Sequence, residues 1–380
     1  MKLSCTRENL FQGLAITSRV GTKNVNLPIL NNVLLQTDAG GLKLISTNLE
    51  IAITCMIRGK VEQQGEYTVP SKLFFDYVNL LPNDRVDMDL LDDALSISCA
   101  RSKTKIKGIT ASEFPLVPPV SGGINYAVSV SEFQQALSQV LFATATNESQ
   151  LRLTGALLSF HNEISGKGTL TVAATDSYRL AESIIKISSG SQEQKDVIVP
   201  QRTLLELSRV FSVFRDDVEA PVAVEINISD NQIVFQYGSV EITSRTIEAE
   251  YPDYRQIIPT TSVSEAALCR STLIQAVKTA SLFSKTGLFD VQITLDPDNG
   301  SVMLSGRDIG RGENTVSLEG AISGTKNNIT LNYRYLLDGL NALKSDIIEL
   351  KVIDGANPCV LLPQGMPDER YRYIIMPIRQ

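Results

Sequence analysis

The stretch VPSKLFFDYVNLLP, residues 69–82, decides the fold because its pattern recurs twice further along the chain. Its apolar residues follow the spacing of one face of a helix, and Pro70 marks the start, since proline lacks the amide hydrogen that the first turn leaves unpaired. Segments of the same kind follow at 201–211 (QRTLLELSRVF) and at 332–344 (NYRYLLDGLNALK). An internal repeat is therefore the first feature of the architecture.

The three predicted helices share a polar face. Each carries a basic, an acidic and a polar residue at positions i, i+4 and i+7, which places the three side chains on one side of the helix. The basic members are Lys72, Arg202 and Arg334, and Arg209 takes the third position in the second helix. These cations either pair with the acidic residue one turn away or contact the phosphates of a nucleic acid. Because the pattern occurs three times, we weigh the two interpretations equally.

A second amphipathic helix precedes each of these segments, with a core-facing stripe at i, i+4 and i+7. The stripe residues are Leu10, Leu14, Thr17, Phe133, Leu137, Val140, Leu273, Val277 and Ala280. Between the helices lie segments of alternating polarity, such as 41–47 and 301–307, which predict antiparallel strands and hairpins. We therefore predict an α+β fold of three similar domains, 1–124, 125–260 and 261–380, each with two helices against about six to eight antiparallel strands.

One predicted strand carries a row of cations. Lys103, Lys105 and Lys107 alternate along it, so their side chains project from the same face of a sheet. Such a row is either a solvated edge, which lysines protect from aggregation, or a docking surface. The pattern by itself leaves both interpretations open.

Composition excludes several classes of protein. Lys and Arg number 35 and Asp and Glu 42, giving a net charge of −7, so bulk attraction to nucleic acid is not expected, although a local basic stripe is allowed. The single histidine, His161, and five scattered cysteines without a C-x-x-C pair argue against a zinc site and against imidazole catalysis. We interpret the cysteines as buried thiols in a reducing cytosol. No secretory signal or membrane span is recognisable, so a cytoplasmic location is expected.

Seven segments together resemble one family, the β sliding clamps of bacterial replicative DNA polymerase. They are LPILNNVLLQ (27–36), VPSKLFFDYVNLLP (69–82), SEFP (112–115), TDSYRL (175–180), YPDYRQIIP (251–259), LNYRYLLDGLNALK (331–344) and YIIMPIRQ (373–380). The resemblance implies a non-enzymatic processivity factor without a cofactor. Three similar domains per chain and a head-to-tail homodimer are expected to close a six-domain ring around duplex DNA, which is held without regard to sequence.

The resemblance assigns the cations to two surfaces. Helices are expected to line the hole and sheets to form the rim. The residues expected to face DNA are Lys23, Lys72, Arg202, Arg209 and Arg334. Lys103, Lys105 and Lys107 are expected to border the edge strand that the partner chain completes.

The resemblance also implies a groove that binds short peptide motifs of the replicative polymerase, the clamp loader and repair proteins. Its wall is expected to consist of Leu153, Thr175, Ser177, Tyr178, Arg179, Leu180, Pro252, Ile257, Tyr335, Ile374, Met376, Pro377 and Ile378. Apolar residues there supply pockets for Leu or Phe anchors of the peptide. The chain departs from the family pattern at Ser177-Tyr178, where Gly-His is usual, and at Gln256 and Asn24, where arginines are usual.

Two other classes of protein are weighed beside this one. An enzyme on a repeated α+β scaffold needs a convergent carboxylate cluster, but the paired acids Asp92 and Asp93 are interpreted as a hairpin turn. A monomeric nucleic-acid-binding module needs stacking aromatics on a basic groove, and aromatic residues make up only 6% of the chain. The oligomeric state therefore separates a dimeric ring from both alternatives.

Overall fold

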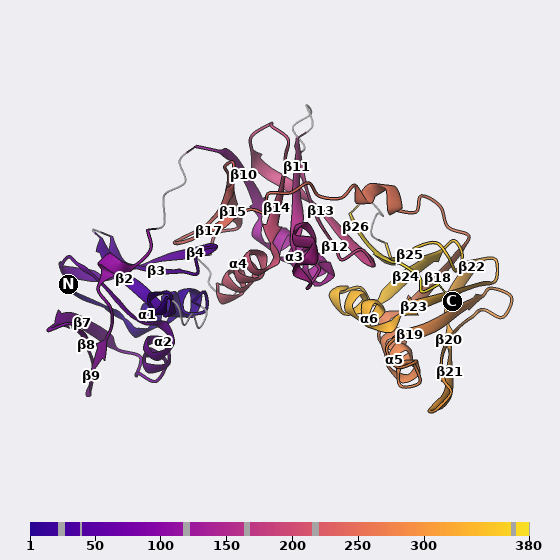
Figure 1. Ribbon diagram of the computed structural model, residues 1–380, viewed down its shortest axis with the longest axis horizontal. Coiled ribbons are helices and arrows are strands. Elements are labelled where there is room, and N and C mark those ends of the chain that lie inside the picture. The colour runs from indigo at the N-terminus through magenta and orange to yellow at the C-terminus, as the bar shows by residue number, and fades with distance from the viewer. Residues whose placement is uncertain are drawn as a thin grey trace. The chain divides into compact units, whose positions relative to one another are not determined.

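The computed structural model describes residues 1–21, 27–38, 40–116, 122–162, 168–214, 220–365 and 370–379 (Figure 1). Its α-helices are α1 (Arg7–Thr17), α2 (Ser71–Asn79), α3 (Val130–Val140), α4 (Gln201–Val213), α5 (Arg270–Ser281) and α6 (Tyr333–Ala342). Each of the three predicted repeats thus contributes two helices. Within the described ranges, no helix is both long enough and apolar enough to cross a membrane.

Antiparallel strands make up most of the remaining chain. The first repeat holds β1 (Lys2–Thr6), β2 (Asn32–Asp38), β3 (Gly41–Thr47), β4 (Ile51–Ile57), β5 (Lys60–Gln63), β6 (Glu66–Pro70), β7 (Arg85–Leu91), β8 (Ala94–Cys99) and β9 (Ser102–Lys107). The second holds β10 (Ile124–Ser129), β11 (Gly155–Asn162), β12 (Gly168–Thr175), β13 (Arg179–Gly190), β14 (Lys195–Pro200), β15 (Ala223–Ile228), β16 (Gln232–Tyr237) and β17 (Val240–Arg245). The third holds β18 (Ser264–Cys269), β19 (Asp290–Asp296), β20 (Ser301–Asp308), β21 (Gly312–Glu319), β22 (Ala321–Gly324), β23 (Asn327–Asn332), β24 (Ile347–Val352), β25 (Cys359–Pro363) and β26 (Tyr371–Ile375).

The chain forms two compact units. The first comprises Met1–Ser131, Ile187–Ser191 and Arg202–Thr246, and the second comprises the remaining residues. In the first unit one sheet runs in the order β6-β2-β3-β4-β17-β16-β15-β10, and a smaller sheet runs β5-β1-β7-β8-β9. Figure 1 shows α1 and α2 beside each other against β2, β3 and β4. The rings of Phe11 in α1 and Phe75 in α2 stack with their centres 5.3 Å apart.

The second unit is built in the same way. Its larger sheet joins β14-β11-β12-β13-β26-β25-β24-β18-β22, and a four-stranded sheet runs β21-β20-β19-β23. Helices α3, α5 and α6 belong to this unit.

The boundary between the two compact units passes through the middle repeat, and the pairing of its strands explains why. Its β17 pairs with β4 of the first repeat, and its β13 pairs with β26 of the third, so each half of the repeat extends a neighbour's sheet. The domain limits near 124 and 260 stay a prediction. The first and third repeats each hold more strands than the six to eight expected, because short strands such as β5 and β22 extend the edges of their sheets, whereas the second repeat is within that range.

The predicted core is confirmed at all nine stripe positions, which are buried. The predicted turn at Asp92 and Asp93 is also confirmed, since both residues have positive φ values, 46° and 57°. The interpretation of all five cysteines as buried thiols is wrong at Cys269, which is exposed. Cys269 stands at the N-cap position of α5, and hydrogen bonds from Ser271 and Thr272 lower the pKa of its thiol to about 7.

Candidate binding surfaces

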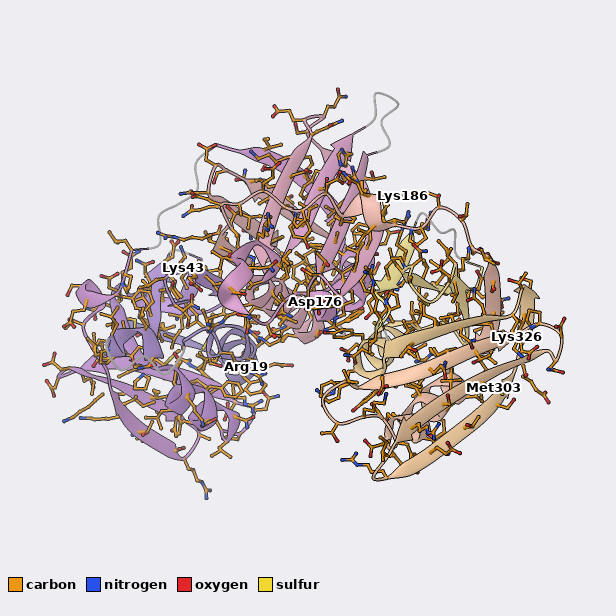
Figure 2. All side chains as sticks on the ribbon, turned by 45° about the vertical axis from the view of Figure 1, so that its right-hand side comes forward. Arg19, Lys43, Asp176, Lys186, Met303 and Lys326 are labelled. Atoms are coloured by element: carbon orange, nitrogen blue, oxygen red, sulfur yellow. The ribbon has the colours of Figure 1, made fainter. Side chains whose placement is uncertain are left out.

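The first candidate surface is built on the turn between β12 and β13. Thr175 Oγ1 donates a hydrogen bond to the carbonyl of Arg179 at 2.7 Å, and Asp176 Oδ1 accepts the amide hydrogens of Tyr178 and Arg179 at 2.9 and 3.0 Å. Ser177 has φ 77°, the left-handed region that glycine adopts more easily, so the Asx turn is what holds a non-glycine residue there. The turn leaves Tyr178 63% exposed. Figure 2 labels Asp176 at this turn.

Arg179 ties this turn to α6. Its side chain is only 10% exposed and forms ion pairs with Asp176 at 3.0 Å and Asp338 at 2.5 Å. The guanidinium carbon lies 4.6 Å from the ring centre of Tyr335 and 5.5 Å from that of Phe142. A planar cation held between two carboxylates and two aromatic rings has a single orientation, so Arg179 is a rigid part of the surface.

The C-terminal segment completes this surface. In the β13–β26 pair, Leu180 lies opposite Ile374. Beyond the strand, the amide of Met376 donates to the carbonyl of Tyr178 at 2.9 Å, and the amide of Ile378 donates to the carbonyl of Thr330 at 2.8 Å. These bonds hold the segment 376–378 half-buried beside the turn.

The predicted groove residues divide into two groups. Accessible or half-buried are Ser177, Tyr178, Arg179, Pro252, Ile257, Tyr335, Met376, Pro377 and Ile378. Buried are Leu153, Thr175, Leu180 and Ile374. Leu180 and Ile374 belong to one buried apolar cluster. The place of the second group in the groove wall stays a prediction.

Sequence reasoning missed residues that position the turn. The hydroxyl of Tyr251 accepts the amide hydrogen of Thr175 at 3.1 Å, and burial raises the pKa of this phenol. Tyr254 donates to the buried carboxylate of Glu182 at 2.6 Å. Both tyrosines stand in the segment YPDYRQIIP, but only the folded chain brings that segment to the turn.

The basic helix residues have different surroundings. Lys72 is exposed on α2, and the guanidinium of Arg334 lies 3.5 Å from the ring centre of Phe289 with its side chain exposed. Arg202 is half-buried and donates one hydrogen bond to the carbonyl of Val20 at 3.1 Å. The predicted residue Lys23 lies outside the described residues.

Arg209 differs from the other basic residues. It donates to the carbonyls of Ala15 and Ile16 at 2.6 Å each and forms an ion pair with Glu206 at 2.7 Å. These carbonyls stand in the last turn of α1, where no intrahelical partner is available, so Arg209 caps that helix. The structure thus uses this guanidinium to join α4 to α1.

The edges of two strands, β9 and β21, form another candidate surface, beside the turn and the basic helix residues. Among the described residues, β9 pairs with β8 alone and β21 with β20 alone. Lys103, Lys105 and Lys107 are exposed on β9, as the alternation predicts. On β21 the carboxylate of Glu313 is also exposed, with a side chain 73% accessible.

Two large apolar residues that directly follow helices are exposed. Leu80, just after α2, is 84% exposed, and Leu282, just after α5, is 66% exposed. The position in α4 that corresponds to Leu80, eight residues beyond the helix's repeated cation, is Val210, which is fully buried.

Comparison with known proteins gives full-length matches. Models of the DNA polymerase III beta subunit match in chain order: the N-terminal domain at residues 1–118, the central domain at 127–253 and the C-terminal domain at 255–379. The beta sliding clamp of Synechococcus elongatus is 33% identical, over 100% of this chain and 99% of its own, and that of Synechocystis is 32% identical with the same coverage. The crystal structure of the DNA polymerase III subunit beta from Pseudomonas aeruginosa is similar with a TM-score of 0.91, 25% identity and full coverage of both chains.

Proposed function

The chain belongs to the family of DNA polymerase III beta subunits, the beta sliding clamps, which are processivity factors of that polymerase and not enzymes, and from this premise we propose how its surfaces act. Two copies close head to tail into a ring around duplex DNA. The ring docks peptide segments of the polymerase, of the clamp loader and of repair proteins at the turn that holds Arg179.

The proposal of a ring rests on the way in which the repeats are joined inside the chain. Each internal junction pairs the last strand of one repeat with the third strand of the main sheet of the repeat before it: β17 with β4, and β26 with β13. In this series β9 is the last strand of the first repeat, and β21 is the counterpart of β4 and β13. Both have free edges within the described chain, so the remaining pairing joins β9 of one copy to β21 of another.

The internal junctions also give the register of this pairing. In both, the first residue of the last strand lies opposite the fifth residue of its partner: Val240 opposite Cys55, and Tyr371 opposite Ser183. The same register places the fourth residue of β9, Lys105, opposite the second residue of β21, Glu313. An exposed cation then faces an exposed carboxylate, and such cross-strand pairs stabilise a sheet.

A disulfide experiment tests the register. The substitutions Lys105→Cys and Glu313→Cys are made together in a Cys269→Ser background, which removes the exposed native thiol. Directly opposite residues lie about 4.5–5.5 Å apart, within the range of a disulfide, so mild oxidation is expected to link two chains into a closed covalent dimer.

A matched control uses the pair Lys105→Cys and Ser317→Cys. Ser317 lies on the same strand and face as Glu313 but four residues further along, which is too far for a disulfide in this register. Equal cross-linking of both pairs, or of neither, would count against the proposed pairing.

DNA binding is proposed for three cations of the helices, of which Lys72 and Arg334 are exposed and Arg202 is half-buried. Lys72, Arg202 and Arg334 stand at equivalent places in three helices, and sequence-independent binding needs cations placed toward phosphates, without contacts to base edges. Arg209 caps α1 and is therefore not expected to contact DNA directly. A net charge of −7 is compatible with this proposal, because enclosure by a ring keeps the protein on DNA without tight binding.

Peptide docking is proposed at the accessible residues of the turn and the C-terminal segment. Tyr178, Met376, Pro377 and Ile378 offer apolar surface, and Met376 can adapt its shape to different anchors. Arg179 stays fixed by its two carboxylates and fixes the orientation of the peptide backbone beside it. Tyr178 and Gln256 set the peptide preference apart from that of relatives with His and Arg at these places.

A further inference from the structure

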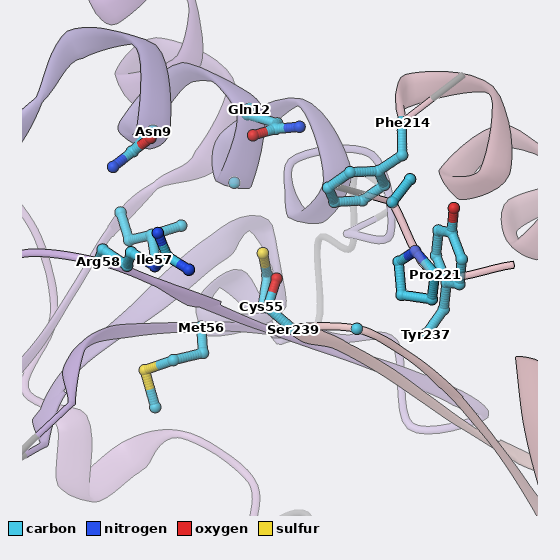
Figure 3. Close-up of a pocket in the computed structure, with 13 residues that line it drawn as sticks. Asn9, Gln12, Cys55, Met56, Ile57, Arg58, Phe214, Pro221, Tyr237 and Ser239 are labelled. Atoms are coloured by element: carbon cyan, nitrogen blue, oxygen red, sulfur yellow. The ribbon is translucent and has the colours of Figure 1, made fainter. Parts of the chain in front are cut away.

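A cleft lies at the junction of β4 and β17 in the first compact unit. It has a volume of about 450 Å³ and a mostly apolar lining. Leu49 and Leu116 stand at its rim, 51% and 95% exposed. We call it the junction cleft. Another cavity of the same volume, about 450 Å³, lies at the other end of this strand pair, between Gln12 of α1 and Tyr237 (Figure 3), but its side chains suggest no particular ligand.

The junction cleft repeats the backbone of the Arg179 turn. Thr47 Oγ1 donates to the carbonyl of Ile51 at 3.0 Å, and Asn48 Oδ1 accepts the amide hydrogens of Glu50 and Ile51 at 3.0 and 2.8 Å. Leu49 has φ 77°, the same value as Ser177 in the other turn.

The neighbouring strand end matches as well. The amide of Arg245 donates to the carbonyl of Glu50 at 3.0 Å, as that of Met376 does to the carbonyl of Tyr178 at 2.9 Å. The same turn and strand end therefore occur in the first unit, around a hollow of their own.

The side chains of the two places differ in charge. Glu50 occupies the position of Tyr178, and Arg245 that of Met376. Both are exposed, and neither forms an ion pair with another described residue. An apolar hollow flanked by a free carboxylate and a free guanidinium is complementary to a ligand that carries an apolar group between an acid and a base.

We propose that the junction cleft is a second docking site, for a short peptide with one large apolar side chain between an acidic and a basic residue. The choice of a peptide rests on the proposed function of the Arg179 turn, whose backbone geometry the cleft shares. The apolar side chain enters the hollow beside Leu49 and Leu116, the acid pairs with Arg245 and the base with Glu50. One clamp chain then holds two peptide segments of different chemistry.

The test uses the pentapeptide Gly-Asp-Phe-Lys-Gly, followed by NMR of the leucine methyl groups of the full chain. Titration to about 5 mM is expected to shift the methyl signals of Leu49 and Leu116 saturably, because a weak complex of such a small ligand has a Kd near the millimolar range. The neutral peptide Gly-Asn-Phe-Gln-Gly is expected to bind more weakly.

Two variants separate the cleft from other surfaces. Leu116→Ser is expected to weaken binding about fivefold, the usual effect of truncating an apolar contact, whereas Val222→Ser, which alters another exposed apolar residue of the same unit, leaves it unchanged. Arg245→Glu is expected to reverse the charge preference, so that Gly-Lys-Phe-Lys-Gly binds better than the original peptide.

The outcomes that overturn the proposal are distinct from failure of the proposed function. Three outcomes would each refute docking at the junction cleft. The methyl signals of Leu49 and Leu116 do not shift, the neutral peptide binds equally well, or binding is lost with Met376→Ala and not with Leu116→Ser. Failure of the Arg179 turn would instead appear as a partner motif whose affinity does not respond to Met376→Ala, and it would leave the Leu116→Ser comparison valid.

Discussion

Reversing one charge at the proposed ring interface gives the most informative perturbation. Lys105→Glu places a carboxylate opposite Glu313 in the register derived from the internal junctions. An exposed cross-strand ion pair contributes about 0.2–1 kcal/mol, and like charges in the same place cost a similar amount. We therefore expect a loss of about 1 kcal/mol at each interface. A closed head-to-tail dimer has two interfaces, so its dissociation constant should rise about 30-fold.

Light scattering across a concentration series measures this effect. The natural protein is expected to show twice the chain mass of 41.5 kDa at micromolar concentration, and the variant to dissociate at higher concentration than the natural protein does. Adding Glu313→Lys to Lys105→Glu restores an opposite-charge pair and is expected to recover most of the affinity. Because the pair is exposed, the difference should shrink as salt is raised.

Lys107→Glu is the matched control, with the same change of charge on the same strand. In this register Lys107 lies opposite Arg311, one residue before β21 begins, and not opposite a carboxylate. This variant is therefore not expected to weaken the dimer. A dimer that tolerates Lys105→Glu, or a double variant that stays as weak as the single one, would refute the register. A chain that is monomeric before any change would refute the unassisted ring itself.

The other predictions concern the groove, the helices and the exposed thiol. Met376→Ala should weaken the binding of a partner peptide at least about fivefold in a fluorescence titration, with the melting temperature unchanged. Leu180→Ala removes a buried side chain and should lower the free energy of unfolding by about 2–5 kcal/mol. The opposite assignment of effects would contradict the division into surface and core. Replacing Lys72 and Arg334 by Glu should reduce the slope of log affinity for DNA against log salt by about 2 without changing peptide binding, and an unchanged slope would remove both residues from the DNA surface. The rate of alkylation of Cys269 by iodoacetamide should rise with pH to a midpoint near 7, because hydrogen bonds from Ser271 and Thr272 stabilise the thiolate and lower its pKa to about 7; a midpoint near 9 would contradict this.

The sequence predicts local structure well where a period carries the information. The helix stripes at Leu10 and Phe133 and the lysines of β9 follow from spacings of 3.6 and 2 residues. The turn at Asp92 and Asp93 follows from the residues that tolerate positive φ. In each case one segment of chain determines the outcome.

The remaining features depend on partners far apart in sequence. A period of two tells which face a strand residue takes, but not which strand lies beside it, so the pairing of β17 with β4 has no local signal. The capping of α1 by Arg209 depends on the same long-range packing. The burial of Leu180 depends on Ile374 in the strand opposite it, which no local pattern around Leu180 indicates.

Topological retention on DNA tests the central claim most directly. The Lys105→Cys, Glu313→Cys dimer in the Cys269→Ser background is oxidised in the presence of a nicked circular plasmid and washed in high salt, which removes binding that depends on phosphate contacts alone. The ring predicts that the protein stays with the circular DNA and is released when a single cut makes the plasmid linear. Release from the circle and the linear form alike, or retention on both, would contradict enclosure of the duplex.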